Sequence, residues 1–136
     1  MKRTATASWN GSGKEGTGKM TTKSTAVKDA QYHYKSRFEQ GVGTNPEELI
    51  AAAHAGCVSM KLSFVLGAAG FEPESIETTC EIDLESGVIK SSHLKIKAKV
   101  PGISPEKFKE SIEDAKENCP VSKALNLSIS VEGELV

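Results

Sequence analysis

The chain has 136 residues, which is enough for one domain with a single core. Its 17 basic residues against 18 acidic residues leave no positive excess, which argues against nucleic acid or an anionic membrane as a partner. The sequence shows no apolar stretch of about 18 residues and no signal-peptide pattern, so we expect a cytoplasmic protein.

The chain contains three cysteines, Cys57, Cys80 and Cys119. Their spacing fits neither a zinc site nor the disulfide framework of a small secreted protein. In a reducing compartment, a disulfide between two of these residues would be transient and catalytic rather than structural.

The N-terminal part of the chain predicts three strands. Residues 4–10 and 18–24 alternate weakly on either side of a glycine-rich turn, which indicates a hairpin. Residues 32–38 alternate between aromatic and basic side chains, which predicts a third strand with Arg37 on its polar face.

A long helix should follow. Asn45 and Pro46 combine an N-cap side chain with proline at the first helical position, and apolar residues then recur every three or four positions until Gly70. A helix over residues 46–69 would be roughly 36 Å long at 1.5 Å per residue, which is unusual for so small a domain. This length suggests a dimer.

The C-terminal part predicts a second hairpin, two helices and a last strand, which gives the order βββαββααβ. That order indicates an α+β fold with largely antiparallel sheets around the long central helix. These elements are placed at 78–84 and 94–100, from Ser104-Pro105, from Cys119-Pro120, and at 127–131.

A glycine cluster at residues 11–16 matches a dinucleotide fingerprint, and residues 13–19 match most of a phosphate-loop pattern. Both motifs need a helix N-terminus beside the glycines to hold phosphate, but the residues that follow carry no apolar helical stripe. We therefore expect no nucleotide site and no cofactor here.

The three histidines are candidate metal ligands. His54 and Cys57 are three residues apart and could form half of a metal site, but no second half is evident. His33 and His93 lie on predicted strands without a companion ligand, and a buried, hydrogen-bonded histidine is the commoner situation. Cys80 alternates with apolar neighbours and is expected to be a small structural hydrophobe.

The local surroundings of the other two thiols differ. Cys57 lies on the apolar stripe of the long helix, which is typical of a core residue. Cys119 precedes Pro120, so backbone N–H groups of the following turn could point toward its sulfur and favour the thiolate. Local features alone therefore favour Cys119 as the more reactive thiol.

Three segments together carry a family resemblance: residues 38–57, 100–103 and 115–122. They resemble the osmotically inducible protein C (OsmC) family over nearly the whole chain. The Ala-Ala-His-Ala run and the Cys-Pro-Val-Ser segment are more similar to this branch than to the sister organic hydroperoxide resistance proteins.

The resemblance implies a single OsmC-like peroxidase domain over residues 1–136, which acts as an intertwined homodimer on organic hydroperoxides and less well on hydrogen peroxide. Cys57 falls on the family's peroxidatic cysteine and Cys119 on its resolving cysteine. Arg37 and Glu47 fall on the charged pair that activates the first thiol, with a two-pronged hydrogen bond between them. The family uses no metal, haem or flavin, and its reductant is typically a lipoyl-type dithiol.

Helix geometry constrains this arrangement. Glu47 and Cys57 would be separated by about 15 Å along a continuous helix and would lie on different faces. Either Arg37 bridges much of the gap, or the helix bends at Gly56, or Glu47 serves the site of the other subunit.

The residues around Cys57 also bear on the substrate and on the class of function. Apolar side chains near Cys57, such as Met60 and Phe64, favour a peroxide with an organic substituent. The main alternative is a non-catalytic dimeric module that binds a lipid or acyl ligand in an apolar cleft. A disulfide oxidoreductase is less favoured, because the chain has no Cys-x-x-Cys motif.

Overall fold

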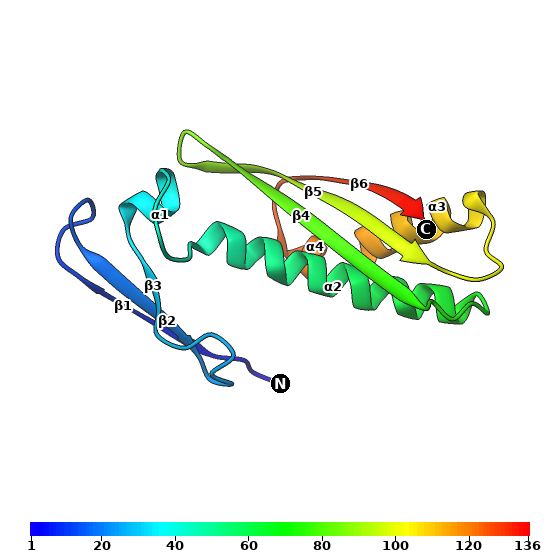
Figure 1. The fold of residues 1–136 in the computed structure, drawn as a ribbon, viewed down its shortest axis with the longest axis horizontal. Helices are drawn as coiled ribbons and strands as arrows, with labels where there is room; N and C mark the ends of the chain where they lie inside the picture. The colour runs from blue at the N-terminus through cyan, green and yellow to red at the C-terminus, as the bar shows by residue number, and fades with distance from the viewer. The chain divides into compact units, whose positions relative to one another are not determined.

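The computed structural model describes all residues from Met1 to Val136 and divides into two compact units (Figure 1). The first unit is Met1–Leu49 and the second is Ile50–Val136. Each unit contains one three-stranded sheet, and the strand orders are β1-β2-β3 and β4-β5-β6. The α+β class predicted from the sequence is confirmed.

The first unit begins with the predicted hairpin. Its strands β1 (Ala5–Asn10) and β2 (Thr17–Thr22) pair antiparallel, and the short β3 (Ala30–Tyr32) pairs antiparallel with β2. A Cβ atom at Gly18 would come within 2.8 Å of atoms of Trp9 and Tyr32. Glycine therefore permits the close approach of these two rings, whose centroids are 5.4 Å apart.

The strand predicted over residues 32–38 is wrong beyond Tyr32. The chain instead forms a short helix, α1 (Tyr34–Phe38), which carries Arg37. His33 is its N-cap: the Nδ1 atom accepts the Ser36 N–H at 3.3 Å, and Ser36 Oγ accepts the His33 N–H at 2.9 Å. This reciprocal capping box satisfies the backbone locally, and it outweighs a short alternating pattern. The secondary-structure order is therefore βββααββααβ.

The long helix α2 (Pro46–Ala68) begins and ends where the sequence predicts. Asn45 Oδ1 caps it by accepting the Glu48 N–H at 2.7 Å. After its last turn, Gly70 adopts a φ of 89°, a conformation that glycine takes at low cost. The helix starts in the first unit and continues through the second.

The second unit contains the predicted second hairpin, formed by β4 (Ser75–Glu85) and β5 (Val88–Lys99). The turn between them is Ser86 and Gly87, with φ values of 52° and 75°. Positive φ at both positions matches the twist of an antiparallel pair.

The last strand, β6 (Ser128–Leu135), differs from the mainly antiparallel expectation because it pairs parallel with β5. Two helices, α3 (Pro105–Asn118) and α4 (Pro120–Ala124), form the crossover that a parallel pair requires. Both helices begin at the predicted proline positions, and Cys119 is at once the C-cap of α3 and the N-cap of α4.

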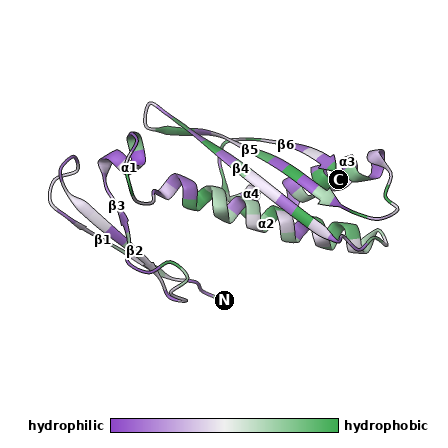
Figure 2. Ribbon diagram, in the orientation of Figure 1, coloured by the Kyte–Doolittle hydropathy of each residue, from purple (hydrophilic) through white to green (hydrophobic).

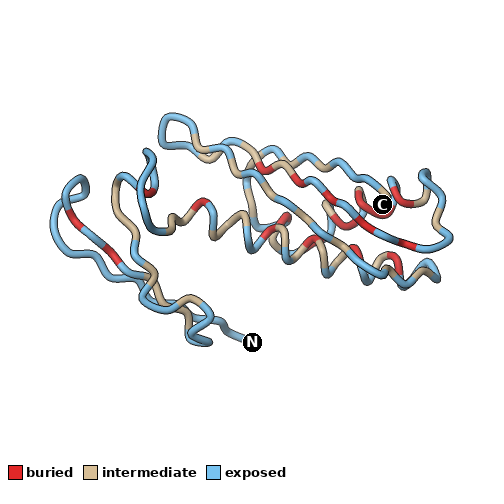
Figure 3. The backbone as a smooth tube through the Cα atoms, viewed as in Figure 1, coloured by how far each residue is buried: buried red, intermediate tan, exposed pale blue.

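The core lies between the β4-β5-β6 sheet and the helices on one of its faces, where buried segments of β5, α2 and α3 concentrate (Figure 3). Gly133 on β6 lets Phe108 and Ile112 of α3 approach the strand, since a Cβ there would come within 2.8 Å of the Phe108 ring and of the Ile112 Cδ1 methyl. The buried apolar residues are Val58, Leu62, Leu66, Leu94, Ile96, Ala98, Val100, Phe108, Ile112, Ala115 and Cys119.

Hydrophobic residues recur along helix α2 (Figure 2), although little of this helix is buried within one chain. Contrary to our expectation from the sequence, it contains an 18-residue window with a mean hydropathy of 1.6, of which only 22% is buried. Length and composition would allow such a helix to cross a membrane, although core helices of water-soluble proteins share these properties. Met60 and Phe64 are 67% and 69% exposed on this helix.

Candidate active site

Two of the three thiols meet in the second unit. Cys57 comes from α2 and is partly buried, whereas Cys119 comes from the joint between α3 and α4 and has no exposed surface. The thiols are close enough for each to alter the pKa of the other. The fold therefore brings together the two cysteines that the family resemblance singles out.

The surroundings of Cys119 favour its thiolate. Its sulfur accepts two hydrogen bonds from Ser122, one from the backbone N–H at 3.3 Å and one from the hydroxyl at 3.4 Å. Burial alone would raise the pKa of Cys119, but the hydrogen bonds from Ser122 and the nearby Cys57 thiol outweigh burial and lower the pKa. The prediction that N–H groups after Pro120 point toward this sulfur is confirmed.

The surroundings of Cys57 act in the opposite direction. Burial and the nearby Cys119 thiol raise the pKa of Cys57, and the backbone of Val121 and the Lys61 ammonium only partly offset them. Residues 50–136 contain no arginine. The second unit therefore offers Cys57 no guanidinium group, and its nearby cation, Lys61, does not offset the effect of burial.

An open groove of about 500 Å³ lies beside Cys57. Its lining is mainly apolar, apart from the ammonium group of Lys61, so it suits an alkyl or aryl group better than a small polar peroxide. The lining residues are Gly56, Cys57, Met60, Lys61, Phe64 and Pro120.

The first unit contains the charged pair. Arg37 Nε on α1 donates a hydrogen bond to Glu47 Oε1 on the first turn of α2, at 2.9 Å. The two-pronged bond that we expected is therefore a single bond. The side chain of Glu47 is 9% exposed and that of Arg37 is 41% exposed, and Glu47 Oε2 is buried without a hydrogen-bond partner. The guanidinium group thus remains accessible while the carboxylate holds it.

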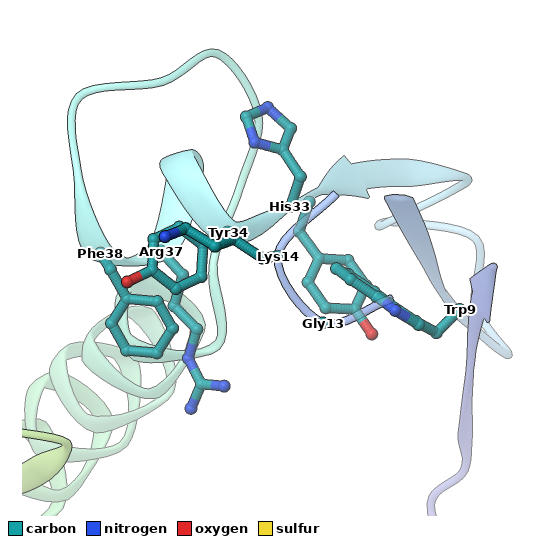
Figure 4. Close-up of a pocket in the computed structure, with 8 residues that line it drawn as sticks. Trp9, Gly13, Lys14, His33, Tyr34, Arg37 and Phe38 are labelled. Atoms are coloured by element: carbon teal, nitrogen blue, oxygen red, sulfur yellow. The ribbon is translucent and has the colours of Figure 1, made fainter. Parts of the chain in front are cut away.

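Arg37 is one of the residues that line an aromatic pocket of about 480 Å³ within the first unit (Figure 4). The guanidinium carbon of Arg37 lies 5.0 Å from the Phe38 ring centroid, and the Lys14 ammonium lies 5.8 Å from that of Tyr34. The sequence did not reveal this pocket, because alternation places Tyr32, Tyr34 and Phe38 on one face of a strand. In the structure Tyr32 lies on β3, Tyr34 and Phe38 lie on α1, and Trp9 joins them from β1.

His54 is buried with both ring nitrogens in use. Its Nδ1 atom lies 2.7 Å from Ser92 Oγ, and its Nε2 atom lies 2.7 Å from Ser122 Oγ. The sequence gave no sign of these two contacts, because Ser92 and Ser122 are distant from His54 in the chain. His93 likewise contacts a serine, Ser130, through Nδ1.

Helix α2 continues through Gly56 without interruption. Of the three arrangements considered for Glu47 and Cys57, this observation argues against the one that needs a bend. Arg37 as a bridge and the use of Glu47 by the other subunit remain as alternatives.

Comparison with known proteins places this geometry in a family. Residues 39–134 match the model of the family described as OsmC-like protein. A relative from Escherichia coli strain K12, Peroxiredoxin OsmC, is 44% identical over 133 residues, which cover 95% of this chain and 93% of the relative. The chain belongs to the OsmC family.

Relatives and solved structures agree with this OsmC assignment. The organic hydroperoxide resistance protein OhrB of Bacillus subtilis is 30% identical over 107 residues, which cover 74% of this chain and 75% of OhrB. Its crystal structure superposes with a TM-score of 0.65 at 26% identity, over 98% of both chains. An OsmC-like protein from Mycoplasma pneumoniae has a TM-score of 0.78 at 16% identity, covers 100% of this chain and 98% of its own, and shows the shared fold.

Proposed function

We propose that this OsmC-family protein is a thiol-dependent peroxidase that reduces organic hydroperoxides to alcohols, and hydrogen peroxide less well. The observation that carries the proposal is the pairing of Cys57 with Cys119 at the edge of an apolar groove. Relatives named as a peroxiredoxin and as organic hydroperoxide resistance proteins support it.

The reaction has two thiol steps. The Cys57 thiolate attacks the distal oxygen of ROOH, the O–O bond breaks, and the alkoxide takes a proton and leaves as alcohol. Cys57 is then a sulfenic acid. The Cys119 thiolate attacks the Cys57 sulfur, the S–O bond breaks, hydroxide leaves and becomes water, and a disulfide forms. A dithiol then reduces the disulfide and is itself oxidised.

Activation of Cys57 is assigned to Arg37. A cation beside a thiol stabilises the thiolate, and this guanidinium is exposed enough to bind both a sulfur anion and a peroxide oxygen. Glu47 holds Arg37 through the 2.9 Å hydrogen bond, so its role is to position the guanidinium.

The functional assembly that we propose is an intertwined homodimer. The apolar window of α2 is only 22% buried in one chain, and Met60 and Phe64 project from it. A second copy of α2 would cover this face. Within such a dimer, either chain could supply Arg37 and Glu47 to a given Cys57.

The proposed reductant is a lipoyl-type dithiol and the proposed location is the cytoplasm. Both rest on the family resemblance and on the chemistry, because a disulfide that must be reduced in each cycle requires a reducing compartment.

Peroxide consumption tests the proposal. Purified protein should consume cumene hydroperoxide in the presence of a dithiol, and Cys57→Ser should abolish this activity. After one equivalent of peroxide, intact-mass measurement should show a loss of about 2 Da for the wild type, and a gain of about 16 Da for Cys119→Ser, whose sulfenic acid cannot be resolved.

The same groove would also suit the alternative, a dimeric module that binds a lipid or acyl ligand without catalysis. If Cys57→Ser consumes peroxide as fast as the wild type, the peroxidase proposal fails. Binding of a fatty acid in the groove by that variant would then favour the alternative.

A further inference from the structure

A series of hydrogen bonds leads from Cys119 into the protein, to side chains that have no part in the mechanism described so far. At its centre is His54 on α2, which has no exposed surface. Its two ring nitrogens contact Ser92 on β5 and Ser122 on α4, each at 2.7 Å. One histidine thus connects a helix, a strand and the segment that carries Cys119.

Both ends of this chain are cysteines. Ser122 Oγ lies 3.4 Å from Cys119 Sγ, and Ser92 Oγ lies 3.1 Å from Cys80 Sγ. The series Cys80, Ser92, His54, Ser122 and Cys119 is named the buried relay below. Ser92, His54 and Cys119 are 0% exposed and Ser122 is 7% exposed, whereas Cys80 is partly buried, so water competes little for the bonds between Ser92 and Cys119.

A count of protons indicates the state of Cys119 that the buried relay fits. Its four contacts need four donors. A neutral histidine, two hydroxyls and the Cys80 thiol supply one each. If all four point along the series, they end at a Cys119 thiolate, and every donor has an acceptor. A protonated Cys119 would add a fifth hydrogen with no acceptor in the series, which is unfavourable in a buried site.

We propose that His54 is a positioning residue that holds Cys119 as a thiolate through Ser122, and that Cys80 orients the far end of the buried relay by donating to Ser92. His54 then carries its proton on Nε2 and donates to Ser122 Oγ, which leaves the Ser122 hydroxyl hydrogen for sulfur. Nδ1 accepts from Ser92 in this arrangement.

The charges around the buried relay are compatible with a neutral His54, because burial lowers its pKa. The titratable groups that face the buried relay are its two end cysteines and Cys57. Beyond these, Lys61 on α2 acts on Cys57 and Glu81 on β4 acts on Cys80. No carboxylate is bonded to the imidazole, so nothing compensates a second proton on it.

This proposal deepens the proposed function and rests on it for its catalytic meaning. A Cys119 thiolate is the nucleophile that attacks the Cys57 sulfenic acid, and it is the leaving group when a dithiol attacks Cys57 of the disulfide. The buried relay should thus accelerate resolution and reduction. In the first step, between Cys57 and peroxide, the buried relay takes no direct part, although the Cys119 thiolate that it holds raises the pKa of Cys57.

The test measures the titration of Cys119 without peroxide or reductant, so its outcome is independent of whether the protein is a peroxidase. In a Cys57→Ser background, iodoacetamide labels Cys119, and the labelled peptide is quantified by mass spectrometry against pH. Because Cys119 has no exposed surface, labelling requires a local opening, so the midpoints are compared only among variants with equal thermal unfolding temperatures. Ser122→Ala and His54→Leu should raise the midpoint by about one unit, which is a tenfold loss of thiolate below it.

Two further variants make the result specific. His54→Gln keeps a donor at the position of Nε2, so it should restore most of the wild-type midpoint. Ser111→Ala is the matched control, since Ser111 is 2% exposed and its hydroxyl donates to the Lys107 carbonyl outside the buried relay. This control should leave the midpoint unchanged.

The proposal is overturned if Ser122→Ala titrates like Ser111→Ala, or if His54→Gln behaves like His54→Leu. Thermal unfolding of each variant checks that the fold is intact. If His54→Leu does not fold, Ser122→Ala decides alone, because it removes only one hydroxyl and keeps the Ser122 backbone N–H bond to sulfur.

Discussion

The two units of this chain differ in content: the second contains the hydrophobic core, and the first contains the ion pair of Arg37 and Glu47. Every buried hydrophobic side chain lies in Ile50–Val136, together with both thiols of the proposed reaction. Met1–Leu49 has no buried hydrophobic residue, and β1 is exposed along its whole length, yet this unit holds the pair formed by Arg37 and Glu47. The second unit therefore has its own hydrophobic core, while the first unit carries the proposed activating group and has no such core.

The largest effect on stability should come from the core of the second unit. Leu94→Ala removes a fully buried side chain and should lower the free energy of unfolding by about 2 to 5 kcal/mol. Urea denaturation measures this loss. Val88→Ala, on the same strand but 55% exposed, should change it by less than about 0.5 kcal/mol. Equal losses for the two variants would contradict the position of the core.

Arg37→Met should separate activity from stability. We expect kcat/KM for cumene hydroperoxide to fall by about 100-fold, or nearly 3 kcal/mol of transition-state stabilisation, because the Cys57 thiolate loses its cation. Stability should change little, because the Arg37 side chain is 41% exposed. Arg3→Met, at the exposed N-terminal end, is the control. If Arg37→Met lowered the free energy of unfolding but left kcat/KM unchanged, Arg37 would be a structural residue rather than the activating one.

The second unit should also be the one that responds to mild acid. Burial lowers the pKa of His54 from its ordinary value of 6.5, so the unfolded chain binds a proton that the folded chain rejects. Stability is thus fully present above 6.5 and is lost as pH falls below it, at up to about 1.4 kcal/mol per pH unit. Urea titrations between neutral and mildly acidic pH measure this slope. His54→Gln should flatten it, and an unchanged slope would contradict the assignment.

The smallest predicted effect concerns the crossover. Ser104 caps α3 by accepting the Lys107 N–H at 3.1 Å, so Ser104→Ala should cost about 1 kcal/mol. Ser104→Asp retains the acceptor and should restore most of the loss. Thermal unfolding of the three proteins gives this comparison, and a silent Ser104→Ala would mean that the cap contributes nothing.

Local signals in the sequence were sufficient for most of the fold. Helix starts at Pro46, Pro105 and Pro120 were predictable because a cap residue and a proline act within one turn. The second hairpin was predictable because alternation and a Ser86-Gly87 turn agree. The strand expected over residues 32–38 failed, because the reciprocal bonds between His33 and Ser36 stabilise a helix that alternation does not indicate.

Features that depend on distant residues could not be predicted from the residues alone. The parallel pairing of β5 with β6 depends on where a two-helix crossover returns the chain. The bonds of His54 join residues that are 38 and 68 positions away, and no local pattern encodes them. The pairing of Cys57 with Cys119 was available only through the family resemblance, whereas the hydrogen bonds that favour a Cys119 thiolate were indicated by Pro120.

The parallel crossover also has a consequence for the order of folding. The β4–β5 hairpin closes through a turn of two residues. The pairing of Ser91 on β5 with Ser128 on β6 closes a much longer loop, which contains the whole of α3 and α4. Contacts of long sequence separation form late because the chain entropy of closing the loop must be overcome first. Cys119 belongs to that loop, so we expect Cys57 to stay exposed during folding until Cys119 packs beside it. Pulse-labelled hydrogen exchange during refolding should accordingly protect β4 and β5 before β6.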